Sequence, residues 1–387
     1  MFNYKIFLTM NKKFFVMAAI AATVFGLAFT SCSNDDEMDA PVQSSVKKGP
    51  RAVNFNVVSN NNVTTRGLDG NIADIQVDGF KTWAFDATST NDGATAFMSG
   101  VACSWDGTNS WFAPATSYYW PEYNLSFIAM TPGTAGTPTV TQPTAGIPQA
   151  VMNYTVPETV SEQKDIMFAG ANDKDYSDCS SDKLPLTFQH ALSQIVFKGF
   201  VDGSSTISKA HVTNISLVHI NKTGTVTYVS GTGASWASQS GDATNVANIV
   251  NADVTASTTD ASPEADDITG SDVTDALAYN NSTTRTQQLL VLPQTVNSGV
   301  SGANISQRSA PATGTYLLVN ADLYANGDND NKVLESSTDV YIPLNEVTWQ
   351  PGYKYTYTLT FGDNLLHPIL FSGSVQAWTA GAGAVEF

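Results

Sequence analysis

Charge is scarce in this chain, and positive charge is the scarcest. Of its 387 residues only 14% are charged, and 18 Lys and Arg face 35 Asp and Glu, so the formal net charge is −17. A surface of this sign repels phosphate backbones and anionic lipid headgroups, so we predict that nucleic acid is not a partner. Low charge combined with abundant Thr, Val and aromatic residues favours strands and turns over surface helices.

Residues that carry catalysis are few and show no recognisable spacing. The four histidines (His190, His211, His219 and His367) lack metal-ligand spacing, and no cysteine lies near them. The chain has no Gly-x-Ser-x-Gly elbow, no phosphate-binding Gly-rich loop and no His-Glu-x-x-His motif. Asp328–Asn331 matches a calcium loop only in part, so we favour a hairpin tip there. We therefore predict no enzyme, no metal and no cofactor.

Long apolar runs are absent except near the N-terminus. Three lysines (Lys5, Lys12 and Lys13) precede the apolar stretch Phe14–Phe29, which ends at Thr30-Ser31-Cys32. Charged, apolar and small-residue regions in this order are typical of a secretory signal, and the run is short for a membrane span. The cysteine after the small residues predicts a lipoprotein signal over residues 1–31, with Cys32 lipidated. The alternatives are an ordinary signal with a free Cys32 thiol, and a start at Met10.

The residues after Cys32 predict a location. Ser33–Glu37 is polar and acidic, and it resembles the export signal that sends lipoproteins of certain gut and oral anaerobes to the cell surface. This resemblance implies a surface-exposed lipoprotein of the outer membrane.

Cysteine is also rare. Lipidation would use Cys32 and leave only Cys103 and Cys179. These two could form a disulfide in an oxidising compartment. Two separately buried thiols are the alternative, because nothing in the sequence reports the distance between them.

The chain contains instead a series of short alternating strands. Val53, Phe55 and Val57 point to one face of Ala52–Val58, with asparagines on the other face, which is the pattern of a half-buried strand. Only His190–Ser193 resembles a helix. Turn residues separate the other strands that we expect: Ile75–Val77, Thr82–Phe85, Ala96–Met98, Trp111–Phe112, Leu125–Met130, Leu184–Phe188, Gln194–Gly199, Val212–His219, Thr225–Val229, Gln288–Leu292, Thr315–Tyr324, Val340–Pro343, Lys354–Phe361 and Ile369–Val375.

The strand pattern predicts an all-β protein with two antiparallel β-sandwich domains in tandem. Ser177–Lys183 is the best boundary, which gives domains at 67–180 and 181–387. Gly231–Thr284 is rich in Ser, Thr, Asp and Gly, and no basic residue occurs between Lys222 and Arg285. We expect a surface insertion at 231–284, because so long a loop is unusual in a compact domain.

Motifs spread along the whole chain point to a family. They are Val53-Asn54-Phe55, Thr65-Arg66-Gly67, Tyr119-Trp120-Pro121, Phe127-Ile128-Ala129, Asp165–Ala169, Leu186–Leu192, Leu290–Gln294, Ile342-Pro343-Leu344, Trp349–Tyr355 and Val375–Trp378. With these motifs, in this order, the chain resembles the fimbrillins, which are subunits of type V pili. The 231–284 stretch is where it departs most from that pattern.

The resemblance implies two transthyretin-like sandwiches and a mode of assembly. The N-terminal propiece, residues 32–66, would supply a removable strand with Val53, Phe55 and Val57 facing inward. An Arg-specific protease would cut between Arg66 and Gly67, and the strand would leave a groove that a strand of another subunit fills. The donor candidate in this chain is its C-terminal segment, residues 371–387.

Alternatives remain at this stage. Arg66 could be an ordinary loop arginine, and Arg51 is a second basic site whose cleavage would leave the strand in place. The implied partners are other pilin subunits, the protease, the outer membrane and a host protein or glycan. The rival hypothesis is a glycan-binding surface lipoprotein, in which the aromatic residues Trp105, Trp111 and Trp236 stack on sugar rings.

Overall fold

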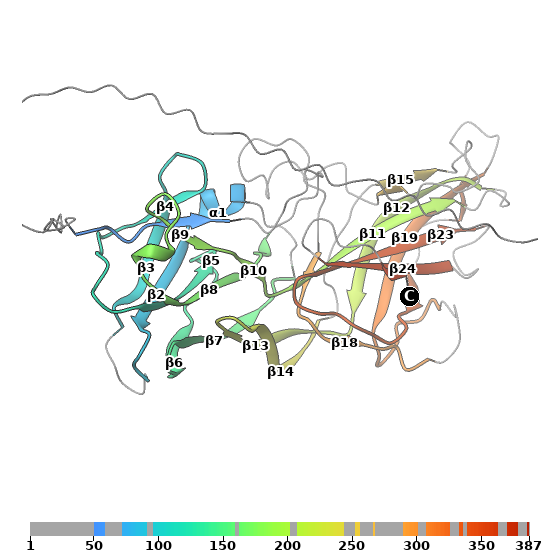
Figure 1. Cartoon of the computed structure of the whole chain (residues 1–387). Helices are drawn as coiled ribbons and strands as arrows, with labels where there is room; N and C mark the ends of the chain where they lie inside the picture. The colour runs from blue at the N-terminus through green and yellow to red at the C-terminus, as the bar shows by residue number, and fades with distance from the viewer. Residues whose placement is uncertain are drawn as a thin grey trace, which may run out of the picture. The chain divides into compact units, whose positions relative to one another are not determined.

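The computed structural model describes residues 50–58, 72–90, 96–158, 162–201, 207–243, 252–255, 266–267, 289–300, 307–325, 333–335, 339–362, 370–377 and 385–386. Residues 49–387 make one compact unit (Figure 1). Strands dominate the described residues, and this confirms the all-β class. None of the helices in the ranges given is long and apolar enough to cross a membrane.

The first part of the fold is built on an eight-stranded sheet in the order β10-β8-β5-β2-β3-β4-β1-β9. All neighbours in this sheet are antiparallel except β1 and β9, which are parallel. Its strands are β1 (Phe55–Val57), β2 (Phe80–Asp86), β3 (Met98–Trp105), β4 (Trp111–Pro114), β5 (Leu125–Thr131), β8 (Met167–Lys174), β9 (Leu184–Leu186) and β10 (Gln189–His190).

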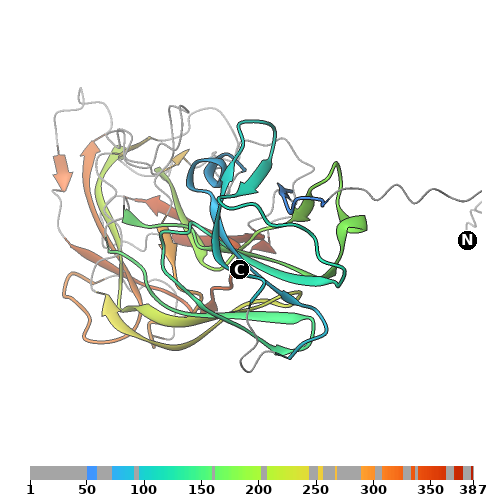
Figure 2. The ribbon, with the colours of Figure 1, turned by 90° about the vertical axis from the view of Figure 1, so that its left-hand side faces the viewer.

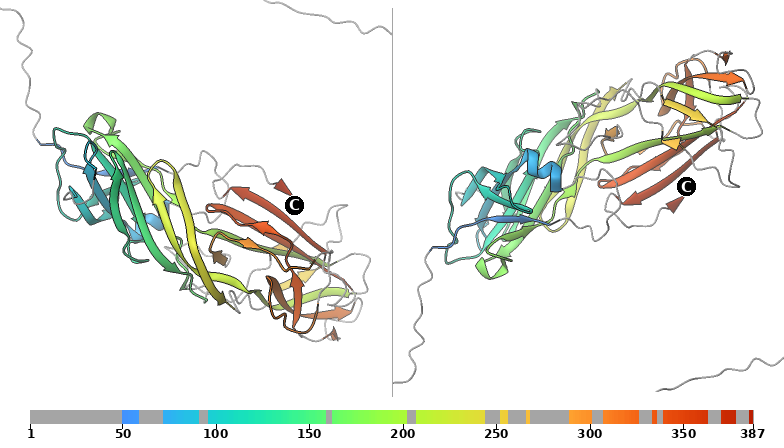
Figure 3. Two further views of the ribbon diagram at one scale, coloured as in Figure 1. Left: turned by 90° about the horizontal axis from the view of Figure 1, so that it is seen from below. Right: turned by 90° about the horizontal axis from the view of Figure 1, so that it is seen from above.

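The eight-stranded sheet has apolar side chains on both faces. One face encloses a cluster that we call the N-terminal core, which includes Phe55, Phe80, Phe112 and Phe127. The other face packs against a four-stranded sheet in the order β14-β13-β7-β6. Figure 3 shows β7 and β13 side by side in this second sheet. Its strands are β6 (Thr139–Thr144), β7 (Ile147–Thr155), β13 (Ile220–Val229) and β14 (Gly233–Ala243).

The second sandwich encloses its own core between two sheets, with Trp349 and Tyr357 at its centre. The first sheet has the order β16-β11-β23-β24-β25, with β17 also on β11, and the second has β15-β12-β19-β20, with β21 on β19. The strands are β11 (Ser193–Val201), β12 (Ile207–Val218), β15 (Ala252–Thr255), β16 (Asp266–Asp267), β17 (Leu289–Val291), β19 (Tyr316–Ala325), β20 (Val333–Glu335), β21 (Val340–Pro343), β23 (Tyr353–Phe361), β24 (Leu370–Ala377) and β25 (Val385–Glu386); β18 (Thr295–Val296) pairs with β22 (Val347–Thr348).

One expected strand, Ile75–Val77, is wrong. Residues Ile72–Asp78 form the helix α1, and Ile75 is buried in the N-terminal core. Gly79 ends the helix with a φ of 62°, and its N–H donates to the carbonyl of Ile75 at 2.8 Å. Glycine is the usual residue at such a left-handed helix end. Two apolar residues two positions apart were too short a pattern to separate a strand from one buried helix face.

The expected helix at His190–Ser193 is also wrong. Gln189 and His190 form β10, which pairs with β8, and Ser193 begins β11. The short polar and apolar mixture in this stretch reflects a chain that leaves one sheet and enters another within three residues. Such a crossing has no sequence period of its own.

The boundary expected at 180/181 does not coincide with a division between sheets. Residues beyond it form β9 and β10 in the eight-stranded sheet and β13 against β7. The first part of the expected 231–284 insertion is the strand β14, which pairs with β13. The turn residues at Ser177–Lys183 mark a turn, and a turn sequence reads the same within a domain as between domains.

The candidate strand-acceptor site

The site centres on β1, which lies inside the eight-stranded sheet with a neighbour on each side. Phe55 faces Phe112 of antiparallel β4 and Leu184 of parallel β9. Figure 2 shows the blue arrow of β1 beside the green arrow of β9. When a strand that pairs with a neighbour on each side is removed, the two neighbouring strands are left with unpaired edges.

Backbone hydrogen bonds hold the strand on both sides. On the β4 side, the N–H of Val53 donates to Tyr118 O at 2.8 Å and that of Val57 to Ser110 O at 2.9 Å. On the β9 side, the N–H of Leu184 donates to Asn54 O at 2.8 Å and that of Val58 to Leu186 O at 2.8 Å. This ladder uses backbone groups alone, so another strand of the right direction could replace it.

The inward side chains of the strand are Val53, Phe55 and Val57, as the alternation predicts. Their exposed fractions are 1%, 0% and 2%. Phe55 makes edge contacts with Phe80 and Phe127, with ring centroids 5.6 and 5.7 Å apart. Burial of three such side chains contributes roughly 5–9 kcal/mol as an upper estimate. The strand is therefore an integral part of this core.

The start of the strand is held by a cation–π contact. The guanidinium carbon of Arg51 lies 3.6 Å from the centroid of the Tyr176 ring, and the Arg51 carbonyl accepts a hydrogen bond from Trp120 N–H at 2.9 Å. A protease needs an extended, accessible backbone around its target bond. Arg51 is half-buried, and both its side chain and its carbonyl group are engaged in contacts. It is therefore a poor target for a protease.

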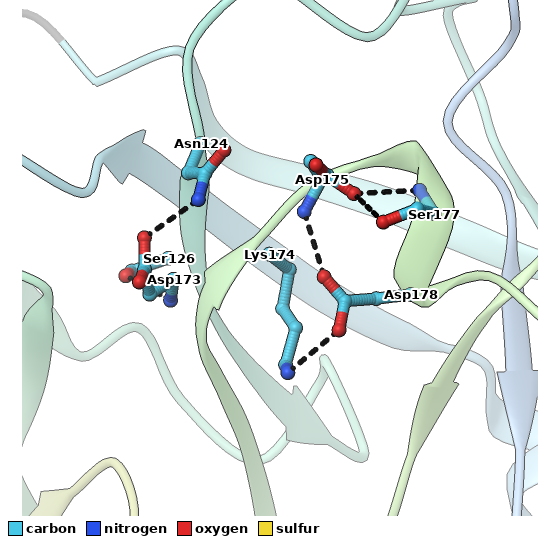
Figure 4. Close-up of polar contacts among 7 residues, drawn as sticks. All are labelled: Asn124, Ser126, Asp173, Lys174, Asp175, Ser177 and Asp178. Carbon is cyan, nitrogen blue, oxygen red and sulfur yellow. Dashed lines mark hydrogen bonds and ion pairs between the residues drawn. The ribbon is translucent and has the colours of Figure 1, made fainter.

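Tyr176 belongs to a short, well-capped turn of 3-10 helix, η2 (Tyr176–Asp178). The Asp175 carboxylate accepts from the Ser177 N–H at 2.6 Å, and the Asp178 carboxylate accepts from the Asp175 N–H at 3.0 Å (Figure 4). That N–H and then the Lys174 ammonium, 3.0 Å from Asp178 Oδ1, lower the pKa of the Asp178 carboxyl group. The Arg51 contact therefore rests on a locally ordered segment.

The two remaining cysteines carry separate thiols. Cys103 is buried in the N-terminal core, and Cys179 is half-buried against the same core. Burial raises the pKa of Cys103 above its ordinary value, and burial together with the Asp178 and Asp175 carboxylates raises that of Cys179 to about 11. Both thiols are therefore poor nucleophiles at neutral pH.

The described parts of the C-terminal donor candidate, residues 371–387, lie at the end of a sheet. Within the described residues, β24 pairs with β23 from Leu370 to Ala377, and β25 pairs with β24 at Val385 and Glu386. In this conformation the segment belongs to the second sandwich of its own chain. Cys32, Arg66 and Gly67 lie outside the described residues.

The three tryptophans of the glycan hypothesis have different environments. Trp236 is half-buried, packs against the core between the first two sheets and donates its indole N–H to Ala191 O at 2.6 Å. The ammonium of Lys183 lies 3.6 Å from the Trp111 ring centroid and covers that face. Trp105 is 38% exposed, and its indole N–H donates to Asn109 O at 2.9 Å. The geometry leaves Trp105 as the one exposed ring of these three.

One of the four histidines has a carboxylate partner. His190 is half-buried, and its Nδ1 lies 2.6 Å from Asp165 Oδ2. Among the described residues no group of three His, Cys, Asp or Glu side chains is arranged to hold a metal. Asp328–Asn331 and His367 lie outside those residues.

The sequence predicted a strand at Leu184–Phe188 but not that this strand forms the far wall of the site. Leu184 and Leu186 of β9 are buried in the N-terminal core beside β1. Near the same strand, the Tyr176 ring contacts the Arg51 guanidinium and the Lys183 ammonium contacts the Trp111 ring. The Leu-x-Leu alternation did indicate a strand here. Its pairing with residues 129 positions earlier carries no local signal.

Comparison with known proteins agrees with this architecture. The model of a family described as fimbrillin-like matches residues 62–378. No curated protein sequence matches. A fimbrial protein from Bacteroides vulgatus is 21% identical, with a TM-score of 0.53, and the match covers 85% of this chain and 100% of that one.

Two further solved structures are more distant. A candidate cell adhesion protein from Bacteroides uniformis is 17% identical, with a TM-score of 0.42 and coverage of 86% and 98%. The tip fimbrial protein Mfa3 from Porphyromonas gingivalis, truncated at its C-terminus, is 11% identical, with a TM-score of 0.35 and coverage of 84% and 98%. On the family match over 62–378, this chain belongs to the fimbrillin-like family, which is a family of structural fimbrial and adhesion proteins rather than of enzymes.

Proposed function

We propose that this protein is a pilus subunit or pilus-associated adhesin that is exported as a lipoprotein and assembled by strand exchange at the β1 site. The single observation that carries the proposal is the position of β1 between β4 and β9, with Val53, Phe55 and Val57 buried. While β1 fills this position the precursor has no open groove, so it remains a monomer.

Cleavage is proposed to occur after Arg66. This residue lies in the stretch between β1 and α1, so cutting there separates the strand from the rest of the chain. The engaged state of Arg51, stacked on Tyr176 and hydrogen-bonded to Trp120, supports the choice of Arg66 over Arg51. The freed strand would then leave together with the lipid on Cys32.

The incoming strand is proposed to come from residues 371–387 of another subunit. It would have to leave β23 and pair with β4 and β9 in place of β1. The place of β24 and β25 at the end of the sheet order supports this, because the two strands together leave the sheet by breaking one ladder, that between β23 and β24. The expected location is the outer membrane and then the fimbrium.

A glycan-binding lipoprotein is the alternative function. The observation that favours it is the group of exposed aromatic rings, Trp105, Tyr119 and Tyr123, which are 38%, 49% and 43% exposed. Exposed aromatic rings stack on sugars. Saturable binding of soluble glycan by an uncut monomer, without any polymer, would favour this function.

The test is limited digestion of the purified chain with an Arg-specific protease, followed by SDS electrophoresis without boiling. We expect a ladder of SDS-resistant multimers from the wild type and none from Arg66→Ala, which should stay a folded, lipidated monomer. Arg308→Ala, which changes an arginine far along the chain, is the matched control and should polymerise. Normal polymerisation of Arg66→Ala would show that Arg66 is not the cut that starts assembly.

A further inference from the structure

One wall of the β1 site is an excursion of the chain that begins and ends on β8. The chain leaves β8 at Lys174, forms η2 and β9, and returns to β8 as β10, where Gln189 faces Phe168. Within the eight-stranded sheet, β9 is the last strand and its described strand partner is β1. We call residues 175–188 the clamp.

The base of the clamp is fixed to the sheet. Asn124 Nδ2 donates to Asp173 Oδ1 at 2.9 Å, and the Asp173 N–H donates to Ser126 Oγ at 2.9 Å (Figure 4). Both partners lie at or next to the start of β5, a strand that is buried along its whole length. The end of β8 therefore stays in place whether or not β1 is present.

The far part of the clamp is held largely by β1. Its backbone bonds run from Leu184 to Asn54 and from Val58 to Leu186, and its Tyr176 ring contacts Arg51. All three contacts end when residues 51–58 leave. The contacts that survive include those of Lys183 with Trp111 and of Phe188 with Phe80, whose centroids are 5.4 Å apart, and the packing of the β9 leucines on the rest of the N-terminal core. The leucines of β9 would then border an open core.

The tip of the clamp also has an unfavourable backbone. Ser180 and Lys183 close a two-residue turn with hydrogen bonds of 2.9 and 3.1 Å, and the two residues between them, Ser181 and Asp182, have φ values of 53° and 64°. A turn with positive φ at both central positions favours Asn-Gly or Asp-Gly. Strained turns without glycine persist when surrounding contacts hold them. Here the hydrogen bond from Leu184, next to the turn, to Asn54 is one of those contacts.

We propose that the clamp closes only over an occupied site, so that its order depends on the strand between β4 and β9. β4 is the fixed edge on which an incoming strand first pairs. The clamp then orders against that strand, and β9 pairs with its second edge. The biological use of this device rests on the strand exchange proposed above, but the coupling itself is a property of the uncut chain.

Hydrogen exchange on the full-length, uncut chain tests the coupling. The informative amides are those of Cys179, Ser180 and Lys183, because their hydrogen bonds are internal to the clamp. Val53→Ala weakens β1 at a residue that pairs with the β4 side and not with β9. If the clamp and β1 open as one unit, exchange at these amides should speed up by the same factor as in β1, about tenfold.

The control is Val101→Ala, a half-buried residue of β3 that packs against the same core. It should leave exchange in the clamp unchanged, because sub-global openings respond to their own contacts. Unchanged clamp amides in Val53→Ala, with faster exchange in β1, would mean that the wall is preformed and would overturn the proposal.

A stabilising variant gives the reciprocal test and avoids any loss of folding. Asp182→Gly relieves the positive φ in the exposed turn and should slow exchange both in the clamp and at Val53 and Val57 by several-fold, because coupling between two sites acts in both directions. Asn109→Gly makes the same kind of change at φ 51° in the β3–β4 hairpin and is the matched control. Slower exchange in the clamp with no change in β1 would contradict the coupling.

These measurements use no protease and no assembly step. The clamp proposal therefore fails on exchange rates alone, even if Arg66→Ala blocks polymerisation. Conversely, coupled exchange combined with normal polymerisation of Arg66→Ala would uphold the clamp and remove the proposed cleavage site.

Discussion

Arg51 lies with its guanidinium carbon 3.6 Å from the centroid of the Tyr176 ring, across the start of the strand that fills the candidate acceptor site. The residues are 125 positions apart in the chain, and the contact joins β1 to the segment that carries β9. Arginine stacks well on aromatic faces because its guanidinium is planar and weakly hydrated.

Replacement of Arg51 by alanine should loosen this end of the strand without emptying the core. We expect a loss of about 0.5–2 kcal/mol in the free energy of unfolding, measured by urea denaturation. Arg51→Lys keeps a cation and should lose less. Equal losses in the two variants would mean that the planar stack contributes nothing.

Phe55→Ala should be far more damaging, because the ring is fully buried against Phe80 and Phe127. We expect a loss of about 3–5 kcal/mol in the free energy of unfolding. The control is Asn56→Ala on the opposite face, where the Asn56 side-chain oxygen accepts a 2.5 Å hydrogen bond from Ser110 Oγ. A half-exposed neutral bond of this kind is worth about 1 kcal/mol, so comparable losses would show that β1 does not complete the core.

Much of the first sandwich could be predicted from the sequence, because alternation is a local property. The pattern of Val53, Phe55 and Val57 predicted which side chains are buried, and the structure buries all three. A strand was also expected at Leu184–Phe188, where β9 lies. The neighbour of β9 could not be predicted, because its parallel pairing with β1 joins segments that are far apart in the sequence.

The structure differs most from the predictions where turn chemistry was used to divide the chain. Ser177–Lys183 contains turn-forming residues because η2 and the tight turn at Ser181 and Asp182 lie there, within one sheet's connection. A second place where the two sandwiches are not separated along the chain is β17. Its Leu290 lies in the core between the first two sheets, and its Leu289 lies in the core of the second sandwich. A strand shared by two cores reads as a continuous apolar run, with no boundary signal.

The lipid anchor gives a third prediction. Cys32→Ala should leave an unacylated precursor or a soluble product, because the thiol of that cysteine is the proposed site of lipid attachment. Metabolic labelling with a fatty acid, followed by N-terminal sequencing of surface-extracted protein, checks this. A blocked Cys32 end would indicate the uncut anchored form, and a Gly67 end the matured subunit. Labelling that persists in Cys32→Ala would show that the lipid is attached elsewhere.

Alkaline pH should weaken the first part of the fold through Tyr228. Burial raises its pKa to about 12, and its ring stacks on Phe168 with centroids 5.1 Å apart. Below about pH 10 both the folded and unfolded states keep the phenol proton, so stability is unaffected there. Between pH 10 and 12 only the unfolded state loses the proton, and stability falls by up to about 1.4 kcal/mol per pH unit. Tyr228→Phe, which keeps the stack, should make the fall in urea midpoint less steep across this window, with Tyr119→Phe at an exposed ring as the matched control. If the fall in urea midpoint between pH 10 and 12 is equally steep in Tyr228→Phe, another group causes the loss of stability at alkaline pH.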